Sequence, residues 1–502
     1  MENFAMLFNG FQTVFTLENL LACILGAVLG LMNGAMPGIG SVAGVAILLP
    51  LTFGFEPTTA IILLGVLYFA NMYGGSYAAI LLNIPGDSPA IMTALDGYPL
   101  ATKKGRPGQA LLTANLSSFI GGTIGIIILT FAGPGLAIVG LRFGPPEMTS
   151  LILMAMTSIA WLLGDSPTKG IIATMLGVLI ATIGFDALTG APRYNFGNLH
   201  LMGGIPFIPF VIGSVGFAEI IKVMSRRKSM SDQAVKANLT IRGSLLSKDE
   251  LVRLLPPALR SGFLGTFIGV LPGAGATTGA FLGYAAQKAF KSKEPLGTGA
   301  VEGVASVESA NSACAAGSFA PLLALGIPGS ATTAILLGGL IMWGLSPGPL
   351  LFTNEPEFAW GLIASLYVAN IVTLAVALLC IPFLIKILSV PLKLVIPMVV
   401  AVCILGSFTA TYSMYGVIIM LASGVLGYFM AKYKYPIAPM LLAYVLTPML
   451  ERSMRQSFIA SGGSVSIFFA SPISLGFLIV FFGLLLFPLI KLVINRVKAL
   501  AR

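Results

Sequence analysis

Two glycine- and proline-containing cassettes, about half a chain apart, carry the residue pattern with the clearest chemistry. Residues 34–44 read GAMPGIGSVAG and residues 269–279 read GVLPGAGATTG. Proline removes a backbone donor and glycine tolerates positive φ, so PGxG ends one helix and allows a sharp reversal before the next. The second helix then directs free N–H groups and its positive dipole end at the turn. Such a turn favours binding of an anion such as a carboxylate.

A second motif follows each cassette in the same order. Residues 75–77 precede Ile84-Pro85-Gly86, and residues 317–319 precede Ile327-Pro328-Gly329. Paired helix breaks in the two halves of an apolar chain are the best sequence indication of a transporter's binding site. We therefore predict a substrate site made by these breaks. Its candidate residues are Pro37, Gly38, Gly40, Ser41, Pro85, Gly86, Asp87, Ser88, Pro272, Gly273, Gly275, Thr277, Pro328, Gly329, Ser330 and Thr332.

Polar side chains in the otherwise apolar segments beside these breaks are candidates for binding a coupling ion. Side-chain oxygens and helix carbonyl ends suit Na⁺, a hard cation. The candidate ion ligands are Asn71, Ser76, Asn311, Ser312 and Ser318. Small residues also allow close helix packing in membranes, which is the alternative for any single position. Packing alone does not require Pro-Gly at equivalent places in both halves.

Several acidic and basic residues admit two interpretations. Asp87 and Asp96 are either caps of loops and helices or ion and proton sites, and Glu302 and Glu308 are functional candidates if they lie within the membrane. Near the C-terminus, Arg452 and Arg455 are positioned to attract an anion or to bind a partner protein. The alternative for Arg455 is an ion pair with Glu451 four residues earlier.

The composition indicates a polytopic membrane protein. The 502 residues are 57% hydrophobic and 9% charged, against about 25% charged in soluble domains. Basic residues lie between apolar segments, which argues against a nucleic-acid-binding stripe despite the net charge of +10. The chain lacks HExxH and GxxxxGK[ST] motifs, so we expect no catalytic residue, no metal site and no cofactor other than Na⁺ as a coupling ion.

The signs of the loop charges predict two repeats of opposite orientation. The first cassette is flanked by loops without Lys or Arg, whereas the second lies between basic loops at residues 226–260 and 288–293. By the positive-inside rule, the second cassette's flanks are cytoplasmic and the first cassette's flanks are outside. We predict a first repeat at 1–224, a basic cytoplasmic connection at 225–258 and an inverted second repeat at 259–502. Parallel repeats, the alternative, would need matching basic loops.

The helices after the two turns are too short to cross a membrane. Residues 41–53 and 276–287 give about 18 to 20 Å of helix at 1.5 Å per residue, against a hydrocarbon core of about 30 Å. We therefore expect two re-entrant helical hairpins. Full crossings are predicted near 109–131, 145–164, 167–185, 203–224, 358–385, 393–411, 413–431, 436–450 and 472–492. The predicted fold is all-α and polytopic, with two inverted repeats and about 10 to 12 transmembrane segments.

The chain resembles the large membrane subunit of the tripartite tricarboxylate transporter family (TctA-type). The most specific matches are the first cassette, residues 71–86, residues 302–329 and the segment from Leu450 to Gly463. The resemblance covers nearly the whole chain. It implies a bacterial inner-membrane symporter that imports citrate or another carboxylate with a cation, commonly Na⁺. It also implies two partners, a periplasmic solute-binding protein and a small membrane subunit.

Three other functions remain as alternatives. The first is a stand-alone cation-coupled organic-anion transporter of the same architecture, which would work without a binding protein. A membrane enzyme is disfavoured by the single histidine and by the absence of HExxH and GxxxxGK[ST] motifs. A channel would not need ion-coupling groups at its helix breaks. For the preferred symporter, the charge pattern places the N-terminus in the periplasm and the C-terminus in the cytoplasm.

Overall fold

The computed structural model describes residues 2–36, 40–162, 166–186, 189–225, 242–381 and 392–500. The described chain is almost entirely helical. A single two-stranded antiparallel ladder occurs in these ranges, between β1 (Gly184–Phe185) and β2 (Pro192–Arg193). The protein is thus an all-α polytopic membrane protein, as the sequence predicts.

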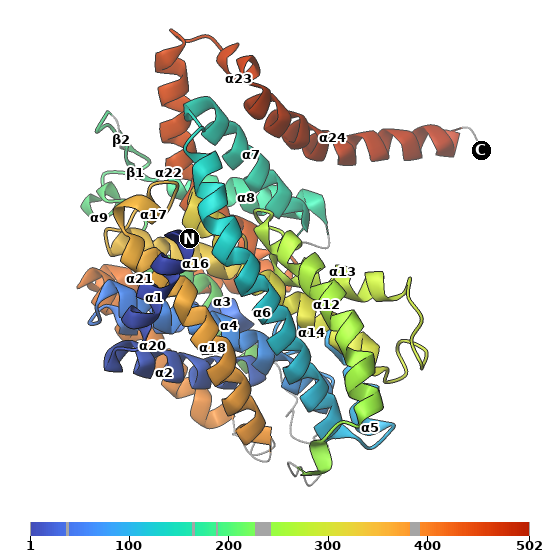
Figure 1. The fold of residues 1–502 in the computed structure, drawn as a ribbon. Helices are drawn as coiled ribbons and strands as arrows, with labels where there is room; N and C mark the ends of the chain where they lie inside the picture. Colours follow the sequence, from blue (N-terminus) through green and yellow to red (C-terminus); the bar gives the residue numbers. More distant parts are fainter. Residues whose placement is uncertain are drawn as a thin grey trace. The chain divides into compact units, whose positions relative to one another are not determined.

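The helices, labelled in Figure 1, alternate long apolar elements with short ones. Their bounds are α1 Glu2–Val14, α2 Leu17–Ala35, α3 Gly40–Leu48, η1 Leu49–Thr52, α4 Pro57–Leu82, α5 Ala90–Thr102, α6 Pro107–Gly140, α7 Pro145–Leu162, α8 Pro167–Ala181, α9 Leu199–Met202, α10 Phe207–Val211, η2 Ile212–Phe217, α11 Ala218–Ser225, η4 Arg242–Ser244, α12 Lys248–Val270, α13 Gly275–Gln287, α14 Val301–Gly317, α15 Phe319–Leu325, α16 Ala331–Met342, α17 Leu351–Asn354, α18 Pro356–Cys380, α20 Leu392–Thr411, α21 Met414–Lys432, α22 Ile437–Ala460, α23 Ile467–Ala470 and α24 Pro472–Leu500.

Proline marks the start of most long helices. It is the first residue of α4, α6, α7, α8, α18 and α24. This position suits proline because its missing N–H would have no partner in the helix and its φ is already helical. Five of these helices, α6, α7, α8, α18 and α24, begin within two residues of the predicted crossings, whereas no crossing was predicted at α4. The predicted crossing at 436–450 is too short, because α22 continues to Ala460 and carries the charged segment on a helix.

Six described helical segments are long and apolar enough to span a bilayer. They are Leu17–Ala35, Pro57–Leu82, Pro107–Gly140, Phe207–Ser225, Pro356–Cys380 and Met414–Lys432. Five further apolar stretches are shorter. Among them, Gly40–Thr52 follows the first cassette and Ala331–Met342 follows Ile327-Pro328-Gly329. The segment Phe207–Ser225 contains a π-helical stretch, η2.

The chain forms two compact units, each assembled from segments of both halves of the sequence. Unit 1 comprises Met1–Ala137 and Phe207–Tyr428, and unit 2 comprises Ile138–Pro206 and Phe429–Arg502. The units therefore follow packing, whereas the repeats predicted above follow sequence. All four helix breaks belong to unit 1.

Within unit 1, each cassette's first helix packs against the helix that carries the glycine at the start of the second motif, Gly75 in α4 or Gly317 in α14. Helix α2 lies along α4, and α12 lies along α14 (Figure 1). Glycines form both contacts. A Cβ atom on Gly26 would come within 2.7 Å of the Leu63 carbonyl oxygen, and one on Gly34 or Gly269 would overlap a backbone carbonyl of the facing helix. Backbones thus touch directly, as small residues permit in membrane helices.

Unit 2 is built around α7, α8 and α22. Helix α22 packs against both α7 and α8, and α24 packs against α7. Hydroxyl pairs join these helices: Thr149 donates to Ser453 Oγ at 3.1 Å, and the Ser150 and Ser474 hydroxyls lie 2.7 Å apart. The ladder of β1 and β2 lies in the connection that follows α8.

Candidate functional site

Each cassette separates two helices, as the sequence predicts. The first joins α2 to α3 and the second joins α12 to α13. The last glycine of each PGxG has positive φ, +64° at Gly40 and +66° at Gly275. This left-handed conformation is unfavourable for other residues and explains glycine at both places. Pro37 and Gly38 lie outside the described residues.

The second motif also breaks a helix in each half. Helix α4 ends at Asn83 (φ +55°) and α15 ends at Gly326 (φ +67°), both left-handed caps. A short non-helical segment with Pro-Gly then leads into α5 or α16. The glycines pack equivalently: Gly86 lies against Gly34 and Gly75, and Gly329 lies against Gly269 and Ser318. The sequence duplication is therefore also a duplication of local structure.

At the first break, Asp87 holds the start of α3. One oxygen of its carboxylate, Oδ2, accepts the N–H of Ser41 at 2.9 Å and the side-chain amide of Asn71 at 2.9 Å. Asn33 completes the cluster by donating to Asn71 Oδ1 at 2.6 Å and to the Gly40 carbonyl at 2.9 Å. The positive end of the α3 dipole stabilises this carboxylate. The sequence predicts that the Ser41 N–H donates to a substrate carboxylate. In the structure, this N–H donates to Asp87 instead.

At the second break, hydroxyl groups replace the carboxylate. Ser330 stands at the position of Asp87 and caps its own helix, accepting the Thr333 N–H at 3.2 Å. The Tyr68 hydroxyl lies 3.2 Å from Ser330 Oγ and 3.4 Å from Ser318 Oγ. The first N–H of α13, at Gly275, donates to the Gly329 carbonyl at 3.2 Å. Both helix starts are therefore held by their neighbouring break.

The two breaks meet in unit 1. Ser41 Oγ and Thr332 Oγ1, from the starts of α3 and α16, lie 3.0 Å apart. Tyr68 on α4 reaches the second break, and Asn311 on α14 donates to the Met72 carbonyl at 3.4 Å. These contacts connect residues of the two sequence halves that are more than 230 positions apart. We name this set of residues around the two breaks the break cluster: Asn33, Gly40, Ser41, Tyr68, Asn71, Asp87, Ser318, Ser330 and Thr332.

The predicted site residues divide into two groups. Gly40, Ser41, Gly86, Asp87, Gly275, Gly329, Ser330 and Thr332 meet at or beside the break cluster. The others lie at its edges: Ser88 is exposed, Thr277 is half-buried in the first turn of α13, and Pro85, Pro272 and Gly273 belong to the turns, while Pro328 is buried beside Gly329.

The predicted ion ligands also differ in their surroundings. Asn71 and Ser318 belong to the break cluster. Ser76 donates to the Tyr73 carbonyl at 2.7 Å, within its own helix. Asn311 Oδ1 and Ser312 Oγ are buried and accept or donate no hydrogen bond among the described residues. Buried polar atoms without partners are rare in proteins, so they single out this part of α14.

Two residues of the break cluster were missing from the predicted set. Asn33 is a polar side chain in an apolar helix, one residue before the first cassette. Tyr68 precedes Asn71 by three residues, a spacing that places both on one helix face. Both signals were available in the sequence, but only the fold shows that these side chains reach the breaks.

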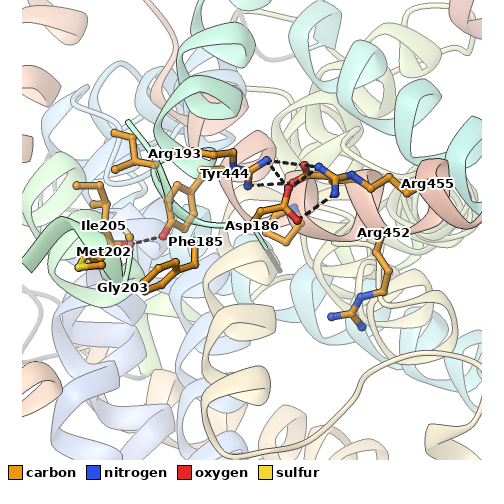
Figure 2. Close-up of a pocket in the computed structure, with 14 residues that line it drawn as sticks. Phe185, Asp186, Arg193, Met202, Gly203, Ile205, Tyr444, Arg452 and Arg455 are labelled. Carbon is orange, nitrogen blue, oxygen red and sulfur yellow. Dashed lines mark hydrogen bonds and ion pairs between the residues drawn. The ribbon is translucent and has the colours of Figure 1, made fainter. Parts of the chain in front are cut away.

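Unit 2 contains a separate charged cavity of about 270 Å³ (Figure 2). Two carboxylates and two guanidinium groups on its wall form an ion-pair network. Arg193 contacts Glu451 at 2.5 Å and Asp186 at 3.4 Å, and Arg455 contacts Glu451 at 2.8 Å and also Asp186. The hydrogen bond to Glu451 raises the pKa of Arg193. The Glu451–Arg455 pair considered from the sequence is confirmed.

Arg452 lines the same cavity in a different way. Its side chain is exposed, and its guanidinium points away from the network in Figure 2. Among the described residues, no carboxylate forms an ion pair with Arg452. With three arginines and two carboxylates, the cavity wall has a net positive charge.

Comparison with known proteins identifies one family. The model of the family described as "Tripartite tricarboxylate transporter TctA family" matches residues 20–442. An uncharacterized 52.8 kDa protein of the TAR-I ttuC' 3' region in Agrobacterium vitis is 38% identical over 472 residues, covering 94% of this chain and 93% of that protein. An uncharacterized protein of the TAR-II ttuC' 3' region is 38% identical over 212 residues, covering 42% and 87%. No solved structure matches the chain.

Proposed function

The chain belongs to the tripartite tricarboxylate transporter TctA family, and from this premise we propose that it is the large subunit of a cation-coupled importer of citrate-like tricarboxylates or related carboxylates. The break cluster is the proposed substrate site. It gathers hydroxyl and amide groups at the starts of two short helices from the two halves of the chain. That juxtaposition is the observation that carries the proposal.

Asp87 gives the proposed site a requirement for a cation. A carboxylate substrate approaching Asp87 meets a like charge, which disfavours binding. A cation beside Asp87, Na⁺ or H⁺, neutralises that charge and makes binding of the anion favourable. Asn71 and the Gly40 carbonyl supply further oxygen atoms near Asp87. Substrate and cation would then bind together, as symport requires.

The proposed transport cycle follows from the same geometry. The hydroxyls of Ser41, Ser330 and Thr332 and the free backbone groups of the turns would bind substrate carboxylates. Alternating exposure of the cluster to the two sides of the membrane would release substrate and cation inside. The alternative is a transporter that works by the same cycle without a binding protein.

The proposed partners are a periplasmic solute-binding protein and a small membrane subunit. The exposed Arg452 and the positive cavity wall in unit 2 are the proposed place of attraction for an anion or an acidic partner surface. Arg455 contributes charge to this wall, although its own guanidinium is engaged by Asp186 and Glu451.

The proposed location is the bacterial inner membrane, with a periplasmic N-terminus and a cytoplasmic C-terminus. Phe55, after the first cassette, and Lys291, after the second, are both exposed. Single cysteines at these positions, in a variant whose four native cysteines are replaced, should react with a membrane-impermeant reagent from opposite sides. Labelling from one side would exclude the inverted orientation of the repeats.

Reconstitution in liposomes tests the proposed function. The chain and a small membrane subunit would be supplied with labelled citrate, an imposed Na⁺ or proton gradient, and a binding protein on one side. We expect accumulation of citrate above its external concentration only when the binding protein is present. Accumulation by this chain alone would establish the stand-alone transporter. Equilibration without accumulation, under every gradient, would indicate a channel and contradict the proposal.

A further inference from the structure

A second acidic group in unit 1 lies deeper than Asp87. Glu308, on α14, has no exposed surface. Its Oε1 contacts the hydroxyl of Thr93 on α5, and its Oε2 accepts the hydroxyl of Ser118 on α6 at 3.2 Å. Asn311 lies one turn further along α14, on the same face of the helix as Glu308. Elements from both halves of the chain therefore surround one buried carboxyl group.

The cationic groups on neighbouring helices are bound elsewhere. On α12, Arg253 pairs with Glu302 and Asp249, and Arg260 donates to Gln287 at 2.8 Å. On the other helices packed against α14, the buried titratable groups have their own partners. On α4, Tyr68 lies beside Ser318 and Ser330, Tyr73 donates to Asn370 and Tyr77 donates to Asn115. On α5, Asp96 accepts backbone N–H groups of residues 297, 299 and 300, and on α13 Tyr284 donates to Asp96. Tyr98 on α5 is half-buried. Within the described residues, Glu308 has no ion pair.

A charged carboxylate at this depth is unfavourable without a counter-ion. Burial of an isolated ion costs several kcal/mol or more, so such groups usually become neutral. A protonated carboxyl satisfies the same contacts, because its O–H can donate to one hydroxyl while its other oxygen accepts from the second. The surroundings of Glu308 thus suit a neutral acid.

Asn311 links this part of α14 to α4. It lies three residues after Glu308 on the same helix face, and its side-chain amide donates to the Met72 carbonyl at 3.4 Å. Met72 follows Asn71, whose side chain holds Asp87. Three side-chain atoms at or beside these positions, Asn311 Oδ1, Ser312 Oγ and Ser117 Oγ, are buried without partners among the described residues. Such atoms are rare in proteins, so they mark a polar region inside unit 1.

We propose that Glu308 takes up and releases one proton in each transport cycle, so that import of the carboxylate is coupled to protons in addition to any cation at Asp87. This inference rests on the proposed function. It adds a second charge-carrying site, one that does not contact the substrate. The carboxyl is neutral while it has no exposed surface, as in this structure, and it loses its proton when the cycle gives it access to water.

The test compares Glu308→Gln with a control on the same helix. Glutamine keeps the size and hydrogen-bonding ability of a protonated glutamic acid but cannot release a proton. Glu302→Gln is the matched control, because Glu302 is also buried but is paired with Arg253. Reconstituted with the binding protein, the wild-type protein and E302Q should accumulate citrate under an imposed proton gradient. E308Q should lose this accumulation while still exchanging internal for external citrate.

Other results would overturn the proposal. They are accumulation by E308Q under a proton gradient at the wild-type level, or loss of both accumulation and exchange in E308Q that remains folded. Wild-type accumulation that responds to Na⁺ but never to a proton gradient would also contradict it. Absence of all transport by the wild-type protein would instead contradict the proposed function.

Infrared spectroscopy tests the protonation without transport. The difference between wild-type and E308Q spectra should contain the C=O stretching band of a protonated carboxylic acid, and the difference between wild-type and E302Q should lack it. A wild-type minus E308Q spectrum showing only carboxylate bands would refute the neutral state. This measurement remains valid even if citrate is not the substrate.

Discussion

The two helix breaks of unit 1 share their packing but not their chemistry. In both, a Pro-Gly segment follows a left-handed cap and lies against the first helix of its cassette. At the next position the first break has Asp87, which binds the start of α3, and the second has Ser330, which caps α16. The backbone at these breaks is therefore duplicated, whereas the charge is found on one side only. The two breaks thus share a backbone arrangement but form a site with a carboxylate at the first break and a hydroxyl at the second.

The largest difference should come from alanine at the paired glycines. A Cβ on Gly86 would overlap the carbonyl oxygen of Gly34, whereas one on Gly329 would lie 2.8 Å from Ser318 Cβ and 2.9 Å from the Gly269 oxygen. We expect Gly86→Ala to cost about 3 kcal/mol or more and abolish uptake, and Gly329→Ala to cost about 1 kcal/mol. Thermal unfolding in detergent and uptake in liposomes measure both. Equal losses of stability and uptake in the two variants would show that the two breaks are equally tightly packed.

The next effect concerns the charge. Asp87→Asn keeps the hydrogen-bonding shape but removes the negative charge that the proposed cation needs. We expect net uptake to fall about tenfold or more, consistent with the loss of an interaction of about 1.5–3 kcal/mol. The dependence of uptake on the coupling cation should weaken as well. Ser330→Ala, the matched change at the second break, removes a helix cap worth about 1 kcal/mol and should leave the cation dependence intact.

If uptake by Asp87→Asn depended on the cation as in the wild-type protein, the cation would not act through Asp87, and the two breaks would not differ in this role. The same conclusion would follow if Ser330→Ala altered cation dependence as strongly as Asp87→Asn. Initial rates measured over a series of cation concentrations distinguish these outcomes from a general loss of folded protein.

The smallest expected effect concerns the ion pair that attaches α12, the first helix of the second cassette. Arg106 contacts Glu250 near the start of α12 at 2.6 Å, and this hydrogen bond lowers the pKa of Glu250 from 4.5 to about 2. The carboxylate therefore stabilises the folded state above pH 4.5, and its contribution is lost as the pH falls from 4.5 towards 2. Because Arg106 is about one-third exposed, we expect Glu250→Gln to cost only about 1–2 kcal/mol at pH 7.

Melting temperatures between pH 7 and pH 3 check this expectation. The wild-type protein should lose stability over that range more steeply than Glu250→Gln. Asp249→Asn is the control, since its carboxylate is 60% exposed. Parallel curves for the wild-type protein and Glu250→Gln would show that this pair does not anchor α12.

Much of the fold could be predicted from the sequence because local signals determine it. Proline at Pro145, Pro167, Pro356 and Pro472 places the starts of four helices, and the PGxG glycines place both turns. The crossing at 436–450 was predicted too short because charged residues usually end a membrane segment. Asp186 and Arg193, distant in sequence, neutralise Glu451 and Arg455, which allows α22 to continue.

The candidate site could be predicted only in outline. The breaks, Ser41, Asp87 and Thr332 follow from the repeated motif, but their partners do not. Asp87 meets Ser41 across 46 positions, and Ser41 meets Thr332 across 291. Such contacts depend on how the helices pack. Helix faces lined with glycine can pack against each other in several relative positions, which the sequence alone does not distinguish. The surroundings of Glu308 were hidden for the same reason, since Thr93 and Ser118 come from other helices.

The glycine contacts beside the breaks have a consequence for which positions tolerate a change of side chain. Gly34 meets Gly86 within the first half, and Gly269 meets Gly329 within the second. Each half therefore contains both sides of its own contact. The next position, Asp87 or Ser330, takes no part in that contact. A carboxylate or a hydroxyl can therefore stand there without altering the backbone at the break.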